Sequence, residues 1–305
     1  MIIYNERKDR TGGDKMEKSK VFFTRDLSPA GAIRAFEALG KKLEGNIGVK
    51  LHSGEPGNQN FLRPAFMKDI VAHVDGTIIE CNTAYDGKRN TTAAHRETML
   101  LHGWTEIADV DIMDAEGQME LKVNGGKHLE VNYVGENLKN YDSVLVLSHF
   151  KGHPMGGYGG ALKNISIGIA SSYGKAYIHG VKDVEKIWSS DHDSFLECMA
   201  DAAKSVVDYF DGKMAFVNIM CNMSVDCDCC AVAEDPKIGD IGILASLDPV
   251  ALDQACIDLV YGSDDEGKAD LIERIESRNG VHTIEAAAEI GVGSRDYELV
   301  NLDLR

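Results

Sequence analysis

The chain has 305 residues, 44% hydrophobic and 27% charged, which is enough apolar material for one large α/β domain or two smaller ones. Its formal net charge of −17 argues against nucleic acid as a partner, because binding to phosphates needs an excess of Lys and Arg. No stretch approaches the ~18 apolar residues of a membrane span, which argues against a membrane protein.

The first residues, MIIYNERKDR, lack the apolar core of a secretory signal, so we expect a cytoplasmic protein. Residues 1–20 are polar and contain a second methionine, Met16. We expect a loose tail or an alternative start there, followed by a single α/β domain over residues 21–305. The seven cysteines are odd in number, which argues for reduced thiols rather than a disulfide framework.

Short β-branched runs alternate with amphipathic stretches from residue 20 onward. This alternation predicts an α/β fold with a mostly parallel sheet and helices on both faces. The predicted strands are Lys20–Arg25, Ile47–His52, Thr77–Asn82, Ser143–Phe150, Met214–Met220, Asp240–Ala245 and a late edge strand, Tyr297–Leu302. Three further runs predict a small antiparallel insertion, a sub-lobe over residues 109–135, made of Asp109–Asp114, Glu120–Val123 and His128–Val134.

Helix start signals lie between these strands, where Thr, Asp or Pro precedes apolar residues at helical spacing. These signals are Pro64, Thr91 or Thr92, Asp193, and Asp248 with Pro249. The inward stripes of the last two helices contain Cys198 and Cys256, which we interpret as core thiols.

Polar side chains able to do chemistry follow four of the predicted strands. The carboxyl ends of parallel strands meet at one edge of a sheet, so we expect the four loops to form one site. Some of these residues also have a structural interpretation: Glu55 pairs with Arg63, and His95 packs on its helix. In the first two loops the candidate ligand-binding residues are His52, Glu55, Asn58, Asn82, Thr83, Arg89 and His95.

The third loop, SHFKGHPMGGYGGALKN, follows a strongly apolar strand and is rich in His and Gly. Its glycines match neither G-x-G-x-x-G nor G-x-x-x-x-G-K-[ST], so the pattern implies no nucleotide, although it fits an anion. A flexible glycine loop with solvent-facing histidines is the alternative. The candidates are His149, Lys151 and His153 for catalysis, and Gly157, Gly159, Gly160, Lys163 and Asn164 for anion binding.

The fourth loop, CNMSVDCDCC, holds four cysteines within ten residues. In an extended segment Cys227 and Cys229 point to one side and Cys230 to the other, so the first two can chelate one soft metal. A histidine, His149 or His153, would complete a zinc or iron site. The spacing matches neither a ferredoxin run nor paired zinc knuckles, and redox-active or incidental thiols stay open as alternatives. The metal candidates are Cys227, Cys229, Cys221, Asp226 and Asp228.

Five segments carry a wider resemblance: HSGEPGN, CNTAYDGKRNTTAAH, FKGHPMGGYGGALKNISIG, DCDC and DIGILASLDPVALDQACIDL. From about residue 21 onward, the sequence resembles the uncharacterised iron–sulfur-centre protein family, domain of unknown function 362. Many members of that family carry a ferredoxin-like insertion with C-x-x-C-x-x-C-x-x-x-C-P runs. This chain has no cysteine between residues 181 and 193, where the insertion would lie. It therefore resembles a short member, and those cluster ligands are not carried over.

A weaker resemblance concerns the strand, the His-Gly loop and the GGALKN segment. Their arrangement is similar to the lactate racemase family, in which histidines exchange a substrate α-proton beside a nickel-bearing cofactor. No motif aligns closely enough for a residue of that family to be carried over.

The sequence thus predicts an enzyme that binds a small anionic metabolite, with a metal ion (zinc or iron) or an iron–sulfur cluster nearby. His149 and His153 would move protons, Lys151 and Arg89 would neutralise the anion, and the thiols would hold the metal. The alternatives are a non-catalytic metal-binding or electron-carrying protein, a racemase-like proton-transfer enzyme, and a ligand sensor. We expect neither nucleic acid nor a membrane as a partner, and a homo-oligomer is compatible with the sequence.

Overall fold

The computed structural model describes residues 18–304, so most of the predicted tail lies outside the described residues. In that range the strands are β1 Ser19–Thr24, β2 Ile47–Lys50, β3 Thr77–Glu80, β4 Val110–Ile112, β5 Gln118–Lys122, β6 Val131–Gly135, β7 Ser143–His149, β8 Lys151–His153, β9 Gly157–Gly159, β10 Met214–Met220, β11 Gly242–Ser246 and β12 Tyr297–Asn301. The α-helices are α1 Pro29–Glu37, α2 Pro64–His73, α3 Thr92–His102, α4 Ala161–Ser166, α5 Ser172–His179, α6 His192–Phe210, α7 Pro249–Tyr261, α8 Lys268–Ser277 and α9 Val281–Glu289.

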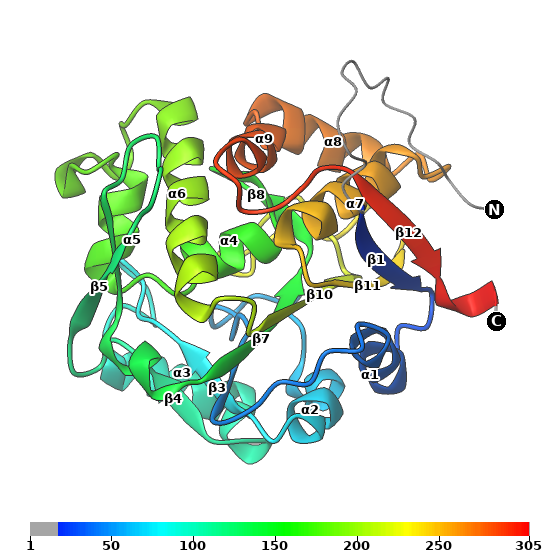
Figure 1. Ribbon diagram of the computed structural model, residues 1–305, viewed down its shortest axis with the longest axis horizontal. Helices are drawn as coiled ribbons and strands as arrows, with labels where there is room; N and C mark the ends of the chain where they lie inside the picture. The colour runs from blue at the N-terminus through cyan, green and yellow to red at the C-terminus, as the bar shows by residue number, and fades with distance from the viewer. Residues whose placement is uncertain (1–17, 305) are drawn as a thin grey trace.

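An eight-stranded sheet in the order β12-β1-β11-β10-β7-β2-β3-β4 forms the centre of the molecule (Figure 1). Strands β10, β7, β2, β3 and β4 pair in parallel, and β11 pairs antiparallel with both of its neighbours. Among the described strands of this sheet only β11 therefore runs in the opposite direction. This confirms the predicted mostly parallel α/β sheet.

Helices cover both faces of the sheet, as the alternation along the chain predicted (Figure 1). On central strand β7, Val144 and Val146 join a core with α4, α6, α7 and α9, whereas Leu145 and Leu147 join a core with α1, α2 and α3. Successive side chains of a strand point to opposite faces, so a strand buried on both sides is apolar throughout. This explains the unbroken hydrophobic run before the third loop.

Helix caps agree with the sequence signals, with one shift. Thr91 accepts a hydrogen bond from the backbone N–H of Ala94, and Asp248 caps α7 ahead of Pro249. Helix α6, predicted to start at Asp193, is instead capped by Asp191, which accepts from Ser194 N. The carboxylate that accepts from a free N–H of the first turn of α6 is thus that of Asp191, two residues before the predicted cap.

Two segments differ from the predicted strands. The run 109–114, expected in the antiparallel insertion, supplies β4, which pairs in parallel with β3 at the sheet edge. Only β5 and β6 form the predicted antiparallel hairpin. The His-Gly loop is not irregular, because β8 and β9 pair antiparallel within it.

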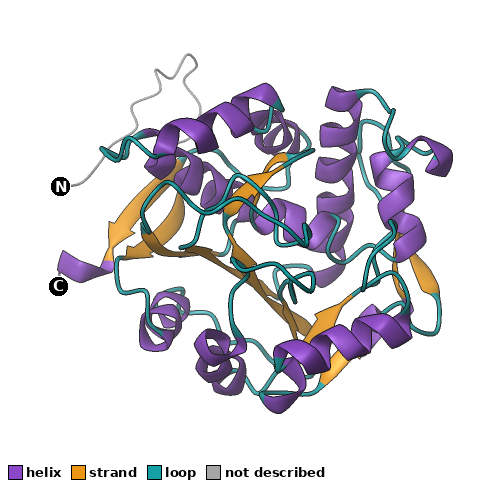
Figure 2. Cartoon of the chain, turned by 180° about the vertical axis from the view of Figure 1, so that it is seen from behind, coloured by secondary structure: helices purple, strands orange, loops and turns teal. Residues whose placement is uncertain are grey.

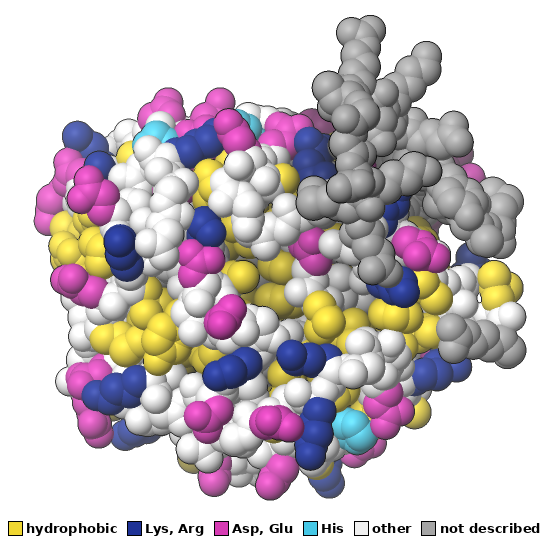
Figure 3. All heavy atoms as spheres, viewed as in Figure 1, with side chains coloured by type: hydrophobic (Ala, Val, Ile, Leu, Met, Phe, Trp, Pro, Cys, Tyr) yellow, Lys and Arg dark blue, Asp and Glu magenta, His cyan; other side chains and the backbone are white. Residues whose placement is uncertain are grey.

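The loops that follow the strands cross the middle of the molecule between the helical layers (Figure 2). On the face shown in Figure 3, acidic and basic side chains are interspersed. Within residues 18–304, no helix combines the length and the apolar character needed to cross a membrane.

Candidate functional site

One cavity of about 280 Å³ is lined by all four loops predicted to converge. Parallel strands bring their carboxyl ends to one edge, which explains why segments so far apart in sequence meet here. The predicted residues that line it are His52, Thr83, Arg89, His149, Lys151, His153, Gly159, Gly160, Lys163, Asn164, Cys227 and Cys229. Those that do not are Glu55, Asn58, Asn82, His95, Gly157, Cys221, Asp226 and Asp228.

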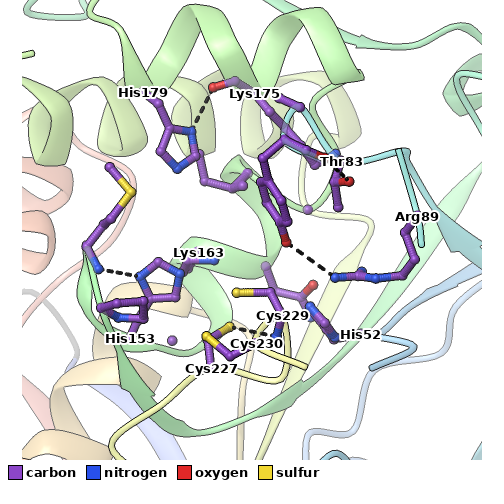
Figure 4. Close-up of a pocket in the computed structure, with 18 of the residues that line it drawn as sticks. His52, Thr83, Arg89, His153, Lys163, Lys175, His179, Cys227, Cys229 and Cys230 are labelled. Carbon is purple, nitrogen blue, oxygen red and sulfur yellow. Dashed lines mark hydrogen bonds between the residues drawn. The ribbon is translucent and has the colours of Figure 1, made fainter. Parts of the chain in front are cut away.

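A histidine and two thiols from different loops come together in this cavity (Figure 4). One ligand atom from each of His153, Cys227 and Cys229 lies within 4.8 Å of the other two. The cysteine segment is a turn, in which Cys230 N donates to the carbonyl of Cys227 at 2.9 Å. The expectation of an extended segment was therefore wrong, and Cys230 lines the cavity instead of facing away.

This donor set fits a single borderline-soft metal ion. Two thiolates and an imidazole are the ligands of catalytic Cys₂His zinc sites, which keep a fourth position open for water or substrate. Here the fourth position would face the cavity, which Cys227 and His153 line. An iron–sulfur cluster is usually held by four thiolates, and this group of described residues contains two cysteines and one histidine.

The nitrogen atoms of His153 are not equivalent. Its Nδ1 accepts hydrogen bonds from the N–H groups of Met155 (3.1 Å) and Gly156 (2.8 Å), so the proton of the neutral ring is on Nε2. Burial, aided by Lys163, lowers the pKa of His153 to about 4. A histidine binds a metal through an unprotonated nitrogen and normally donates its other N–H to an acceptor, so His153 could bind at Nε2 only if its proton moved to Nδ1 and displaced the two backbone donors. It is therefore a weaker metal ligand than the thiolates.

Asp228 lies between the two ligand cysteines in sequence but serves as an anchor. Its carboxylate accepts from His149 Nδ1 at 2.9 Å and pairs with Lys151 Nζ at 3.0 Å. Nε2 of His149 donates to the carbonyl of Cys221 at 2.6 Å, so both ring nitrogens are engaged. Burial alone would raise the pKa of Asp228, but His149 and Lys151 hold it well below its usual range.

Two other metal candidates also point elsewhere. Asp226 pairs with Arg274 at 3.2 Å and accepts from the backbone of Glu234. Cys221 belongs to the core on the α1–α3 side of the sheet and is absent from the three-residue group. The spacing along the chain alone could not reveal these orientations.

The first loop clamps the cysteine turn. The side-chain amide of Asn58 donates to the carbonyls of Cys230 (2.8 Å) and Cys227 (3.3 Å), and Glu55 N donates to the carbonyl of Asp228 at 2.8 Å. These two predicted ligand-binding residues therefore hold the cysteine turn in place. The Glu55 carboxylate pairs with Arg89 at 2.8 Å, so the expected pair of Glu55 with Arg63 does not form.

A buried carboxylate, Glu80, organises the wall beside the first two loops. It pairs with His95 at 2.9 Å and with Lys50 at 3.6 Å. Burial would raise the pKa of Glu80, but Lys50 and the hydrogen bond from His95 hold it well below its usual range. Nδ1 of His95 faces the carbonyl oxygen of Asn82 at 3.3 Å. His95 and Asn82 thus support the wall without lining the cavity.

Two lysines line the cavity without a carboxylate partner in residues 18–304. The side chain of Lys163 has no hydrogen-bond or ion-pair partner there, and Nζ of Lys175 donates only to the carbonyls of Ala170 (2.6 Å) and Cys81 (3.5 Å). Burial lowers the pKa of Lys175. Uncompensated cations near a cavity favour a negatively charged ligand.

His179 on α5, which was not among the predicted site residues, also lines the cavity (Figure 4). Its Nδ1 donates to the carbonyl of Lys175 at 2.7 Å, and its ring stacks on Phe195. Burial lowers the pKa of His179 to about 4, so Nε2 is an unprotonated acceptor. In contrast, His52 accepts from Gly54 N at Nδ1 (3.0 Å), which places its ring proton on Nε2.

The predicted anion-binding glycine segment is partly occupied by the protein itself. The first two N–H groups of α4, from Ala161 and Leu162, donate to the carboxylate of Asp253 at 2.8 and 3.0 Å. A Cβ on Gly160 would lie 2.5 Å from that carboxylate. Gly157 (φ +76°) packs against Gly280 instead of the cavity. The amino end of α4 is thus already neutralised, and Lys163 and Lys175 remain as cavity-lining cations without a carboxylate partner in residues 18–304.

Several lining residues were missed at the sequence level, and some left a signal. Lys50 and Glu80 are the last residues of apolar strands, where a charged side chain is conspicuous. Lys175 and His179 are four residues apart on α5, hence on one face. The other missed lining residues, which only the tertiary structure reveals, are Cys81, Ala84, Tyr85, Ser148, Pro154, Met155, Ile167, Gly168, Ile187, Trp188 and Cys230.

Comparisons with known proteins address the fold and the family. The structure is similar to the lactate racemase apoprotein from Thermoanaerobacterium thermosaccharolyticum, with 12% identity, a TM-score of 0.45, and coverage of 99% of this chain and 87% of that one. It is also similar to a protein from Thermotoga maritima, with 10% identity, a TM-score of 0.44, and coverage of 86% of this chain and 58% of that one. Scores this low say nothing about what this chain binds.

No curated protein matches the sequence. One family model does match, described as "Domain of unknown function (DUF362)", and it covers residues 47–258. That range contains all four cavity-lining loops and the His153, Cys227 and Cys229 group. The chain belongs to the DUF362 family.

Proposed function

We propose that this chain is a metal-dependent enzyme that binds a small anion in the cavity and moves a proton to or from it. The observation that carries the proposal is the meeting of a His153, Cys227 and Cys229 group with two lysines that lack a carboxylate partner among the described residues, 18–304. A metal site alone would also suit a carrier protein. Uncompensated cations and differently protonated histidines in the same cavity favour catalysis.

The metal would be held mainly by the two thiolates, with His153 as the third ligand. Such an ion would supply Lewis-acid polarisation of a bound oxygen. We favour one zinc or iron ion over a cluster because Cys221 lies apart from the group. Asp228, Asn58 and Glu55 orient the turn that carries the ligands.

Anion binding falls to Lys163 and Lys175, with Arg89 engaged by Glu55 and Lys151 engaged by Asp228. Nε2 of His179 would accept a proton, and Nε2–H of His52 would donate a hydrogen bond or a proton. We assign His149 a positioning role, because both of its nitrogens are engaged.

Anaerobic purification followed by elemental analysis and an absorption spectrum tests the metal. We expect about one zinc or iron per chain, most of it lost in Cys227→Ser and less in His153→Ala, since the imidazole is the weaker ligand. Visible absorption typical of iron–sulfur would indicate a cluster and contradict the assignment of a single ion. Absence of metal under anaerobic conditions would contradict the metal proposal.

Calorimetric titration with acetate, propionate and inorganic phosphate tests the anion site. We expect binding that is lost in Lys163→Ala and is unaffected in Lys204→Ala, a matched lysine on α6 that pairs with Asp208 and does not line the cavity. Equal binding by both variants would contradict the assignment of Lys163. Proton transfer is then measured by NMR as exchange of the C–H bonds beside the carboxylate in heavy water, with His179→Ala as the inactive variant.

A further inference from the structure

One side of the cavity is apolar and aromatic, which the anion site alone does not explain. Tyr85 and Trp188 both line the cavity, and their ring centroids are 6.4 Å apart at 56°. Trp188 nevertheless has 70% of its surface exposed. Ile187 and Met155 extend the same apolar lining. A large indole left in solvent at a cavity is typical of a surface that a ligand covers.

The segment that carries Trp188 is held in place by hydrogen bonds. Lys182 N donates to the carbonyl of Tyr177 at 2.8 Å, and Ser189 N and Ser190 N donate to that of Lys186 at 3.0 and 3.1 Å. The hydroxyl of Ser190 also donates to the carbonyl of His179. The backbone that carries the indole is therefore held in place before any ligand arrives, which lowers the entropy cost of ordering this segment on binding.

The two kinds of lining lie in one cavity of about 280 Å³, so a single small molecule can touch both. Lys163 and Lys175 attract negative charge, as argued above. An aliphatic anion would satisfy these cations but would leave the indole of Trp188 in water. A ligand with a flat ring attached to its anionic group would cover both surfaces.

We infer that the ligand is an aromatic or similarly flat-ringed anion, whose charged group binds at Lys163 and Lys175 and whose ring stacks on Trp188 beside Tyr85. This assignment of the substrate class rests on the anion site proposed above. It adds a second requirement, a planar ring, which that proposal does not contain.

Three probes separate the contribution of the anionic group to binding from that of the ring: 3-phenylpropionate, propionate and 3-phenylpropanol. The two tryptophans make the measurement direct, because Trp104 is fully buried and Trp188 is exposed. We expect 3-phenylpropionate to quench and blue-shift the emission of Trp188 and to bind about tenfold more tightly than either of the other probes. Propionate should bind without changing the emission of Trp188.

Calorimetry on variants identifies the residue responsible. Trp188→Ala should weaken binding of 3-phenylpropionate about five- to tenfold, leave propionate unchanged, and be largely rescued in Trp188→Phe. Tyr209→Ala, which removes an exposed ring outside the cavity, is the matched control and should change nothing.

Equal affinities for 3-phenylpropionate and propionate, or equal losses for all probes in Trp188→Ala, would overturn the ring requirement while leaving the anion site intact. Failure of both anions to bind would instead overturn the anion site itself. Tighter binding of 3-phenylpropanol than of 3-phenylpropionate would show an apolar site without charge selection, and would also overturn the inference.

Discussion

The cysteines show how position decides the role of a side chain. Cys227 and Cys229 share a cavity with His153, whereas Cys198 and Cys256 are buried in apolar clusters. A buried thiol packs as a small hydrophobic group, and a hydroxyl in its place has a desolvation cost.

Serine substitutions should therefore separate the two roles. We expect Cys227→Ser and Cys229→Ser to lose most of the bound metal, measured by elemental analysis, with little change in stability of the metal-free protein. Cys198→Ser and Cys256→Ser should keep the metal and lose about 1–3 kcal/mol of stability in urea unfolding. Equal metal content in all four variants would show that Cys227 and Cys229 do not bind the metal.

Gly157 illustrates a residue whose role changed once the fold was known. The sequence places it among the predicted anion-binding residues. In the structure its φ is +76° and an added Cβ would meet Gly280 at 2.8 Å, away from the cavity. Gly157→Val should thus destabilise the protein by several kcal/mol, about 2–4 by analogy with other strained and overpacked sites.

Gly159 provides the matched comparison, because an added Cβ would meet the flexible side chain of Lys151 at 3.5 Å. Gly159→Ala should fold with nearly normal stability in urea unfolding and should bind anions more weakly, because the methyl group enters the cavity. Normal stability in Gly157→Val would contradict the packing role given to that glycine.

At the scale of elements, the short helix α4 depends on a distant carboxylate. Asp253 on α7 accepts from two N–H groups of α4, from the Tyr158 hydroxyl at 3.1 Å and from Asn218 at 2.8 Å. Burial raises the pKa of Asp253 to about 6, although these hydrogen bonds act in the opposite direction. Four donors thus do not fully offset the loss of water around the carboxylate.

This shift predicts a pH dependence of stability. With its pKa raised, Asp253 holds its proton more tightly in the folded protein than in the unfolded chain. The contribution of Asp253 to the unfolding free energy should therefore be most favourable below about pH 4, decline as the pH rises to about 6, and stay level above that. The decline is on the order of 2–3 kcal/mol.

The measurement is the difference in unfolding free energy between the native protein and Asp253→Asn across that range. Glu80 and Asp228 have lowered pKa values, so their contribution to the unfolding free energy is lost at more acidic pH. Both proteins contain these two residues, so their contribution cancels when the two unfolding free energies are subtracted. A difference that does not vary with pH would mean that Asp253 titrates normally.

Local patterns were sufficient to predict most helices and strands, because capping residues and hydrophobic periodicity depend only on residues close together in the sequence. Asp248 with Pro249 and Thr91 mark helix starts that the structure confirms. The orientation of β4 could not be predicted, because it depends on pairing with β3 and not on its own three residues. The cysteine turn was missed for a related reason, since Asn58 and Asp228 bend a segment whose pattern alone is compatible with an extended chain.

At the scale of the whole molecule, the sequence was sufficient to locate the site but not to predict which residues line the cavity. Parallel strands place their carboxyl ends together, so convergence of the four loops follows from topology. Whether a residue lines the cavity or supports it depends on pairings across the fold, such as Glu55 with Arg89 and Glu80 with His95. No spacing along the chain encodes those pairings.

Metal binding should stabilise the entire fold, because its ligands join the loop after β10 to the β8–β9 hairpin. With zinc at about 100 times its Kd, the gain in unfolding free energy is about 2.7 kcal/mol. Thermal unfolding with and without zinc checks this gain, and Cys227→Ser should abolish it. A similar gain in that variant would place the zinc elsewhere.

The clamp between the first loop and the cysteine turn has a consequence for dynamics. The backbone amides of Glu55 and Cys230 donate to carbonyls inside the turn, and the side-chain amide of Asn58 donates to the carbonyls of Cys227 and Cys230. Amide hydrogens in loops usually exchange rapidly with solvent, whereas hydrogen-bonded and covered ones exchange slowly. The backbone amide hydrogens of Glu55 and Cys230 should therefore exchange with solvent at rates typical of the central strands, although both residues lie in loops.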